Sequence, residues 1–255
     1  MPQKIQRYGW IPDIPDQRDH LFSAPVLAPQ DLPAKIDLSS QCPPVYDQGQ
    51  LGSCTANAIA AAFEFTELKE QQQSEFRPSR LFIYYNERLM EGTINSDSGA
   101  QIRDGIKSVA TVGVCPEPDW PYDIANFSEK PPNSCYQTAG QHKVKRYLRL
   151  TQSLILMKAC LAAGYPFVFG FTVYESFEGP QVAQTGDVPM PAPGEQVMGG
   201  HAVVAVGYDE ASSRFIVRNS WGTGWGKQGY FTMPYAYLTQ AHPALASDFW
   251  TIRTV

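Results

Sequence analysis

The sequence predicts an α+β protein with two lobes, a helical lobe followed by a β-rich lobe. Helix-like apolar spacing is concentrated in the first half of the chain, whereas runs of β-branched and aromatic residues, typical of buried strands, are concentrated in the second half. The length of 255 residues is ordinary for two lobes and is large enough to bury a substantial core.

The expected elements follow from these patterns. Helix patterns lie at about 54–70, 78–91 and 100–112, and another helix is expected between Thr151 and Gly164. Strand patterns lie at about 166–173, 201–208, 214–219, 229–233 and 248–254. We place the helical lobe at about 45–150 and the β lobe at about 151–255, and we treat residues 1–35 as an extended segment before the domain of residues 36–255.

A cysteine at the start of a helix pattern is the first candidate for chemistry. Residues 47–54 are polar and interrupted by glycines, and Cys54 is followed directly by the helix-forming stretch 55–65. The free N–H groups and partial positive charge of a first helical turn stabilise a thiolate and lower the pKa of the thiol. Gln48 is near enough in sequence for its side-chain amide to donate to an anion beside the sulfur. Taken alone, such a cysteine is more often a buried structural residue.

A histidine and an asparagine further along the chain change that interpretation. His201 stands between a Gly-Gly pair and a β-branched run typical of a buried strand, and Asn219 ends the next strand pattern. Two neighbouring strands would carry the two side chains next to each other. An Asn oxygen that accepts one imidazole N–H sets the tautomer and orientation of the ring, so that the other nitrogen faces the thiol. The sequence therefore predicts a Cys54, His201, Asn219 set.

With these motifs the chain resembles the papain-like cysteine peptidases. The family signature at the nucleophile is Cys-Gly-Ser-Cys-Trp, with Ala or Tyr allowed at the third or last place, and His and Asn far downstream; residues 51–55 here read Leu-Gly-Ser-Cys-Thr. The resemblance covers roughly residues 36–255 and implies a papain-like fold with a β-barrel-like C-terminal lobe and a cleft between the lobes. The other matching motifs are Gln48-Gly49, Gly113-Val114, Trp120-Pro121-Tyr122, Asn219-Ser220-Trp221-Gly222, Gly224-Trp225-Gly226 and Gly229-Tyr230.

The chain departs from the family at the loop of the nucleophile. Family members usually tie this loop to the cleft with a disulfide, but Leu51 replaces the first cysteine and the partner region, residues 95–100, has none. We expect packing and hydrogen bonds to hold the loop instead. The glycine rail that binds substrate backbone in the family corresponds here either to Ser98-Gly99 or to Gly99-Ala100.

The resemblance implies a cysteine endopeptidase that uses no metal or other cofactor. Cys54 and His201 would form a thiolate–imidazolium pair, and the Gln48 side chain and the Cys54 N–H would bind the oxyanion. His201 would protonate the leaving amine and later activate water, while Trp221 would cover its hydrogen bond to Asn219. The expected substrate-binding residues are Gly52, Ser53, Ser98, Gly99, Ala100, Gly170, Gly200, Ala202 and Trp221.

Small residues in this set suggest a substrate preference. Gly170 and Ala202 leave room for a bulky apolar side chain at the second residue before the cut. Two alternatives to hydrolysis remain open from the sequence. An amine could replace water at the thioester, which would make the protein a peptide ligase or transferase, or the cleft could bind peptides without catalysis.

Composition and charge limit the kinds of partner that the protein is expected to bind. The net charge is −5, the basic stretch at 142–149 is typical of a solvated face, and no apolar run approaches the roughly 20 residues of a membrane span. We therefore expect a monomer that acts on peptides or proteins, without nucleic acid or membrane. The first ten residues lack the apolar core of a classical signal peptide, so secreted and cytoplasmic locations both stay open.

The other cysteines show no spacing typical of zinc sites. Cys160 lies in a helix pattern and is expected to be a buried free thiol. Cys115 and Cys135 bracket residues 120–122 and are the first candidates for a disulfide, with the free thiols as the equal alternative.

Residues 1–35 are too short and too rich in proline for the helical propeptide that is usual in the family. Apolar residues such as Trp10 and Ile14 nevertheless need a surface to lie on. We expect this segment either to cross the cleft, where it would inhibit the enzyme, or to pack as a strap on the outside.

Overall fold

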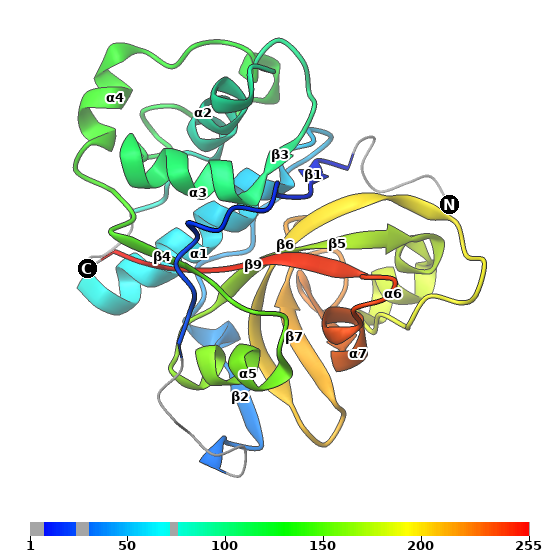
Figure 1. Ribbon diagram of the computed structural model, residues 1–255. Coiled ribbons are helices and arrows are strands. Elements are labelled where there is room, and N and C mark those ends of the chain that lie inside the picture. Colours follow the sequence, from blue (N-terminus) through cyan, green and yellow to red (C-terminus); the bar gives the residue numbers. More distant parts are fainter. Residues whose placement is uncertain (1–7, 24–30, 72–75, 255) are drawn as a thin grey trace.

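The structure is a computed structural model that describes residues 8–23, 31–71 and 76–254, with helices gathered at one end and a large sheet at the other (Figure 1). Three helices lie within two residues of their predicted bounds, namely α1 (Cys54–Gln71), α2 (Arg80–Glu91) and α3 (Ile102–Thr111). A shorter helix, α4 (Asn133–Ala139), completes this end of the molecule.

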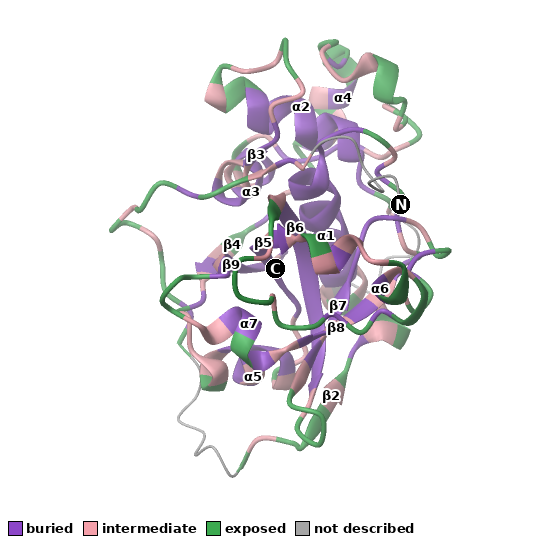
Figure 2. Cartoon of the chain, turned by 90° about the vertical axis from the view of Figure 1, so that its right-hand side faces the viewer, coloured by how far each residue is buried: buried purple, intermediate pink, exposed green. Residues whose placement is uncertain are grey.

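Helix α1 is central to the fold. It packs against the sheet on one side and against α2 and α3 on the other, and its first turns are buried on every face (Figure 2). A helix without a polar face is typical of a protein interior. Its alanines, which let the neighbouring elements approach closely, are Ala56, Ala58, Ala60, Ala61 and Ala62. This burial positions Cys54, the first residue of α1, deep in the molecule.

Seven strands form the sheet, and their order is β4-β9-β5-β6-β7-β8 with β2 paired to β6. Five of them match the predicted strands, although β6 begins four residues before its predicted start. The seven are β2 (Lys35–Asp37), β4 (Arg146–Arg149), β5 (Phe167–Tyr174), β6 (Val197–Asp209), β7 (Arg214–Arg218), β8 (Tyr230–Pro234) and β9 (Ala246–Arg253). All pairings in this sheet are antiparallel.

The expectation of a barrel-like lobe needs one correction. In the described part of the chain the strand order ends on β4 at one edge and on β8 at the other, so the sheet does not close on itself. Edge strands of such a sheet need other cover. Short elements surround the sheet, namely α5 (Leu154–Ala162), α6 (Pro180–Thr185), α7 (Tyr235–Thr239) and the 3₁₀ turns Ser39–Gln41 and Glu175–Glu178. A third 3₁₀ turn, Ile124–Asn126, precedes α4. The helix expected at 151–164 is thus α5.

The N-terminal residues 8–23, here called the strap, run as an extended chain between the helices and the sheet (dark blue in Figure 1). Strand β1 (Trp10–Ile11) pairs in parallel with β3 (Ala100–Gln101), so the strap is hydrogen-bonded to the helical end of the molecule. At its other end the Phe22 N–H donates to the Arg149 carbonyl at 2.8 Å, on strand β4. The strap therefore spans both parts of the fold.

All five cysteines are free thiols. The candidate disulfide between Cys115 and Cys135 is not formed, although the two side chains are in hydrogen-bond contact. Cys160 is a fully buried free thiol, as predicted. None of the helices in the described residues has the length and apolar character needed to cross a bilayer.

Candidate active site

The fold brings together His201 and Asn219, which lie near the same end of two paired strands, where Val204 faces Arg218. His201 is in β6, Asn219 follows β7, and the two strands pair antiparallel. His201 Nε2 and Asn219 Oδ1 are 2.8 Å apart, and the Ser220 N–H donates to the same oxygen at 2.9 Å. Since an amide oxygen only accepts, Nε2 carries the proton and Nδ1 is left as the basic nitrogen. His201 Nδ1 has no hydrogen-bond partner among the residues that the structure describes.

Cys54 begins helix α1, and both it and His201 are fully buried. Burial raises the pKa of the Cys54 thiol to about 12, against backbone N–H groups of Ala202, Gly9 and Thr55 that lower it. Burial also lowers the pKa of His201 to about 4, against the Asn219 hydrogen bond. Both shifts favour the neutral form of the group in this closed form. The predicted thiolate–imidazolium pair is not favoured while the cleft is covered, because neither charge is hydrated.

Gln48 is held rigidly beside the nucleophile loop. Its Oε1 accepts from the Ser220 hydroxyl at 2.7 Å, and its Nε2 donates one proton to the Leu51 carbonyl at 3.0 Å. The Gln48 N–H also donates to the Ser220 carbonyl at 2.8 Å. With Oε1 occupied, the second Nε2 proton is the group left for a substrate oxyanion.

Trp221 covers the His201 ring. The two ring centroids are 4.9 Å apart, and Trp221 packs in turn on Phe177 and Trp225. Phe171 lies on another side of His201 with a centroid distance of 5.8 Å. These apolar rings exclude water from the hydrogen bond between His201 and Asn219, which strengthens that bond.

The strap occupies the space in front of the nucleophile. A Cβ built on Gly9 would lie 1.7 Å from the Gly52 carbonyl oxygen, so only glycine fits at this point. The Ala100 N–H donates to the Gly9 carbonyl at 2.8 Å, and a Cβ on Gly99 would lie 2.0 Å from that oxygen. The strap thus pairs with Gly99 and Ala100, while Ser98 turns its hydroxyl to the Gly99 carbonyl.

The residues on either side of Gly9 fill the two ends of the site. Tyr8 lies over His201 and Trp221, at centroid distances of 6.2 and 6.4 Å. On the other side the Trp10 indole packs on bare backbone, since a Cβ on Gly170 would lie 2.0 Å from the ring and one on Gly200 would lie 2.7 Å away. The cleft therefore holds a three-residue segment of its own chain.

Comparisons with known proteins agree with this geometry. The family model described as papain family cysteine protease matches residues 32–242. The chain belongs to the papain family of cysteine proteases. It is 44% identical, over 98% of its own length and 88% of the relative, to the "Uncharacterized peptidase C1-like protein L477" of Acanthamoeba polyphaga mimivirus. The structure of xylellain, a cysteine protease from Xylella fastidiosa, superimposes with a TM-score of 0.91 at 47% identity, covering 100% of this chain and 98% of xylellain.

More distant relatives extend the comparison. Cysteine proteinase 3 of Entamoeba histolytica is 26% identical over 88% of this chain and 69% of the relative. Procathepsin B from Trypanosoma congolense shares the fold, with a TM-score of 0.76 at 17% identity over 97% of this chain and 87% of the other. The predictions of a papain-like fold and of a cysteine protease are confirmed.

In this papain-family protease a carboxylate stands where relatives usually place a disulfide. Asp97 accepts the Gly52 N–H on both oxygens, at 3.0 and 3.1 Å, and also accepts the Tyr84 hydroxyl. The Gly99 N–H donates to the Tyr84 oxygen at 3.2 Å. The nucleophile loop and the loop at 95–100 are thereby joined by charge-assisted hydrogen bonds. The sequence expectation of a loop held without a disulfide fits this contact.

Replacing Asp97 by Ala is expected to lower the free energy of unfolding by about 2–4 kcal/mol, because a buried hydroxyl and an N–H lose a charged acceptor. Urea denaturation of the full chain measures the change. Ser98→Ala is the matched control, since that hydroxyl donates to the carbonyl of its neighbour Gly99 and not to the nucleophile loop in the described part of the chain. Equal midpoints for Asp97→Ala and Ser98→Ala would contradict this role for Asp97.

Two residues that support the site were not assigned a role from the sequence. The Tyr122 hydroxyl donates to the Gln48 carbonyl at 3.0 Å and contacts the Ser53 hydroxyl. Arg80 donates to the Asp47 carbonyl at 3.1 Å and to Asn57 Oδ1 at 3.2 Å. Its guanidinium lies 3.9 Å from the centre of the Tyr122 ring. The Trp-Pro-Tyr motif was the only available signal for Tyr122, and Arg80 had none.

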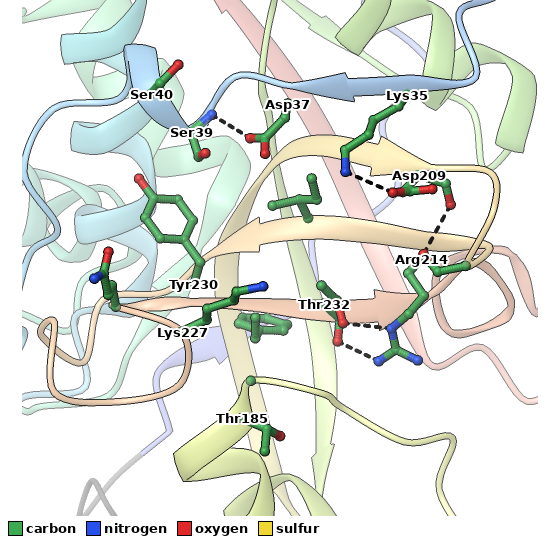
Figure 3. Close-up of a pocket in the computed structure, with 15 residues that line it drawn as sticks. Lys35, Asp37, Ser39, Ser40, Thr185, Asp209, Arg214, Lys227, Tyr230 and Thr232 are labelled. Atoms are coloured by element: carbon green, nitrogen blue, oxygen red, sulfur yellow. Dashed lines mark hydrogen bonds and ion pairs between the residues drawn. The ribbon is translucent and has the colours of Figure 1, made fainter.

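A cavity of about 500 Å³ lies away from this cleft, on the side of the sheet formed by β2, β7 and β8 (Figure 3). Several of its charged groups are already engaged. Lys35 pairs with Asp209 at 3.0 Å, and Arg214 donates to Thr232 and to the Val188 carbonyl. The residues that line this cavity do not include Cys54, His201, Asn219 or Gln48.

Proposed function

We propose that this papain-family protease is an endopeptidase in which Cys54 is the nucleophile and His201, Asn219 and Gln48 assist it. The observation that carries the proposal is the His201–Asn219 hydrogen bond, which leaves His201 Nδ1 as the basic nitrogen in a cleft where Cys54 opens a buried helix. This supports an acid–base partner for the thiol.

Peptide hydrolysis then follows in two stages. The Cys54 thiol gives its proton to His201 Nδ1 and its sulfur attacks the peptide carbonyl, and the Gln48 amide and the Cys54 N–H bind the resulting oxyanion. His201 gives its proton to the leaving amine, and a thioester remains. His201 next takes a proton from water, whose oxygen attacks the thioester and releases a carboxylic acid and the thiol. Entry of a substrate in place of the strap would change the environment of the Cys54 thiolate and of the His201 imidazolium.

The strap supports the further proposal that the full chain is latent. His201 must reach the leaving amine, so the C-terminal side of a substrate lies toward His201 and Trp221 and its N-terminal side toward Gly170. The strap runs in the opposite direction, from Tyr8 at His201 to Trp10 at Gly170. Its Gly9 carbonyl bonds to Ala100 instead of the oxyanion site. A reversed segment blocks the cleft without being a good substrate.

The way the strap is anchored predicts a pH dependence. Asp13 Oδ1 accepts the Arg103 N–H at 3.0 Å, and Asp13 Oδ2 accepts the Trp250 indole N–H at 2.8 Å. Burial and the neighbouring Asp248 raise the pKa of Asp13 from 3.8 to about 6, against Arg103, which lowers it. The docked strap therefore binds a proton that the released strap gives up. Its docking is strongest below about pH 4 and weakens as the pH rises through 6.

The measurement for this dependence is the alkylation rate of Cys54 in the full chain divided by the rate in full-length Gly9→Ala, because the ratio cancels the ionisation of the thiol itself. We expect this ratio to rise by roughly tenfold to a hundredfold from pH 4 to pH 7. In an Asp13→Asn chain the ratio is expected to stay flat. A flat ratio in the unaltered chain would contradict the linkage.

Mass spectrometry of the products tests the proposed function. Peptide fragments that end in a free carboxylate identify hydrolysis, whereas fragments extended by an added amine identify the ligase or transferase alternative. Binding of peptide without fragments would identify a silent binding module. The Trp10 site supports a preference for a bulky side chain at the second residue before the cut, lined by Gly170, Gly200 and Ala202.

A further inference from the structure

The pocket that holds Trp10 has a charged end. The Trp10 indole N–H donates to Asp248 Oδ2 at 3.1 Å, and the Asp248 side chain is 3% exposed. Asp248 has a left-handed backbone with φ 57° and lies at an irregularity of the β5–β9 pairing, where Val168 faces Trp250 but Gly170 faces Ser247. Such a bulge re-aims a side chain relative to a regular strand. Here it brings a carboxylate to an otherwise apolar pocket.

We propose that Asp248 is a specificity residue, which selects tryptophan at the second residue before the scissile bond. The proposal rests on the endopeptidase function proposed above and on the strap marking the substrate pocket. Tryptophan has two features that match this pocket. Its large flat ring packs against the glycine backbone, and the N–H at the far edge of the ring is a hydrogen-bond donor for the carboxylate.

Release of the strap leaves Asp248 short of donors. Oδ2 receives the Trp10 indole and also the Asp13 N–H, at 2.8 Å, and both groups belong to the strap. A buried carboxylate oxygen that loses its donors is costly. A substrate side chain that donates at the same place restores one of them, whereas phenylalanine or leucine would fill the space and leave the oxygen bare.

The pocket needs a donor more than a positive charge. Arg149 Nη2 already lies 3.6 Å from Asp248 Oδ1, and Asp19 pairs with both Arg103 and Arg149. Asp13 and Asp19 both belong to the strap, so release of the strap leaves Arg103 and Arg149 with Asp248 as the remaining carboxylate. An arginine or lysine of the substrate would add a cation beside Arg149, so the structure favours a neutral donor.

Two peptide substrates that differ only at this position test the proposal. One carries tryptophan and the other carries 3-benzothienylalanine, which has the same shape with sulfur in place of the N–H. In full-length Gly9→Ala, whose strap cannot sit at Gly52, we expect kcat/KM to be at least about tenfold higher for tryptophan. We expect a peptide with arginine there to be slower than the tryptophan peptide.

Variants of Asp248 assign the preference. In full-length Gly9→Ala, the additional substitution Asp248→Gly, which suits the left-handed backbone, is expected to bring the ratio of the two kcat/KM values close to one. Adding Gln228→Gly, at an exposed left-handed position away from the cleft, is the matched control and should keep the ratio. Asp248→Asn, which keeps the size of the side chain, should reduce the ratio if the glycine variant fails to fold.

A ratio near one in Gly9→Ala itself, or a ratio that survives loss of the carboxylate, would overturn the role of Asp248. Failure of the endopeptidase function looks different, because neither peptide would then be cleaved. In that case protection of Cys54 from alkylation by the two peptides still measures the preference, and equal protection would again overturn it.

Discussion

Replacing His201 by Ala is expected to lower kcat/KM for peptide hydrolysis by roughly 10⁴-fold or more. In the proposed mechanism His201 supplies both the base for the Cys54 thiol and the acid for the leaving amine, so its loss removes two functions at once. The comparison is made in full-length Gly9→Ala, so that the cleft is open in both proteins. His142→Ala is the control, because that ring stacks on Phe76 far from the cleft.

Alkylation of Cys54 by iodoacetamide gives the same comparison without turnover. In the open cleft we expect rapid labelling well below pH 7, as a thiolate paired with imidazolium requires. In His201→Ala labelling should rise only near the ~8.5 of an ordinary thiol. Identical profiles for both proteins would mean that the pair does not form, and the silent binding module would become the better description.

Gly9→Ala in the otherwise unaltered chain is expected to raise kcat/KM for a small peptide by at least about tenfold. The added methyl group would lie 1.7 Å from the Gly52 carbonyl oxygen, which is backbone and cannot turn away. The strap must then leave the position in which Tyr8, Gly9 and Trp10 fill the site. The apparent rate of a latent enzyme is proportional to the fraction of molecules whose cleft is open. Even a modest shift of the equilibrium toward the open form therefore raises the measured rate.

Gly224→Ala is the matched control for this experiment, because a Cβ at Gly224 meets no atom within 4 Å. It should leave the rate as in the unaltered chain. Urea denaturation of both variants shows whether either change damages the fold. An unchanged rate in a well-folded Gly9→Ala protein would show that the strap does not limit access to Cys54.

The helices, the strands and the central residues of the site were predictable because their signals are local. Cys54 follows a glycine-rich run and opens a helix, and His201 stands in a β-branched strand beside glycines. Periodicity also identified α1, α2 and α3 to within two residues. Short elements such as β1, β3 and β4 were missed, since two to four residues are too few for a period to appear.

The sequence by itself determined the chemistry of this protein, because the reactive groups and their immediate neighbours are encoded in short motifs. Only the tertiary structure decided what surrounds that chemistry. Asp97 replaces a disulfide, Trp10 fills the cleft and Asp248 reaches the pocket through an irregular strand pairing, and each of these contacts joins segments far apart in the chain. Burial likewise raises the pKa of Cys54 and lowers the pKa of His201, which no local pattern reports.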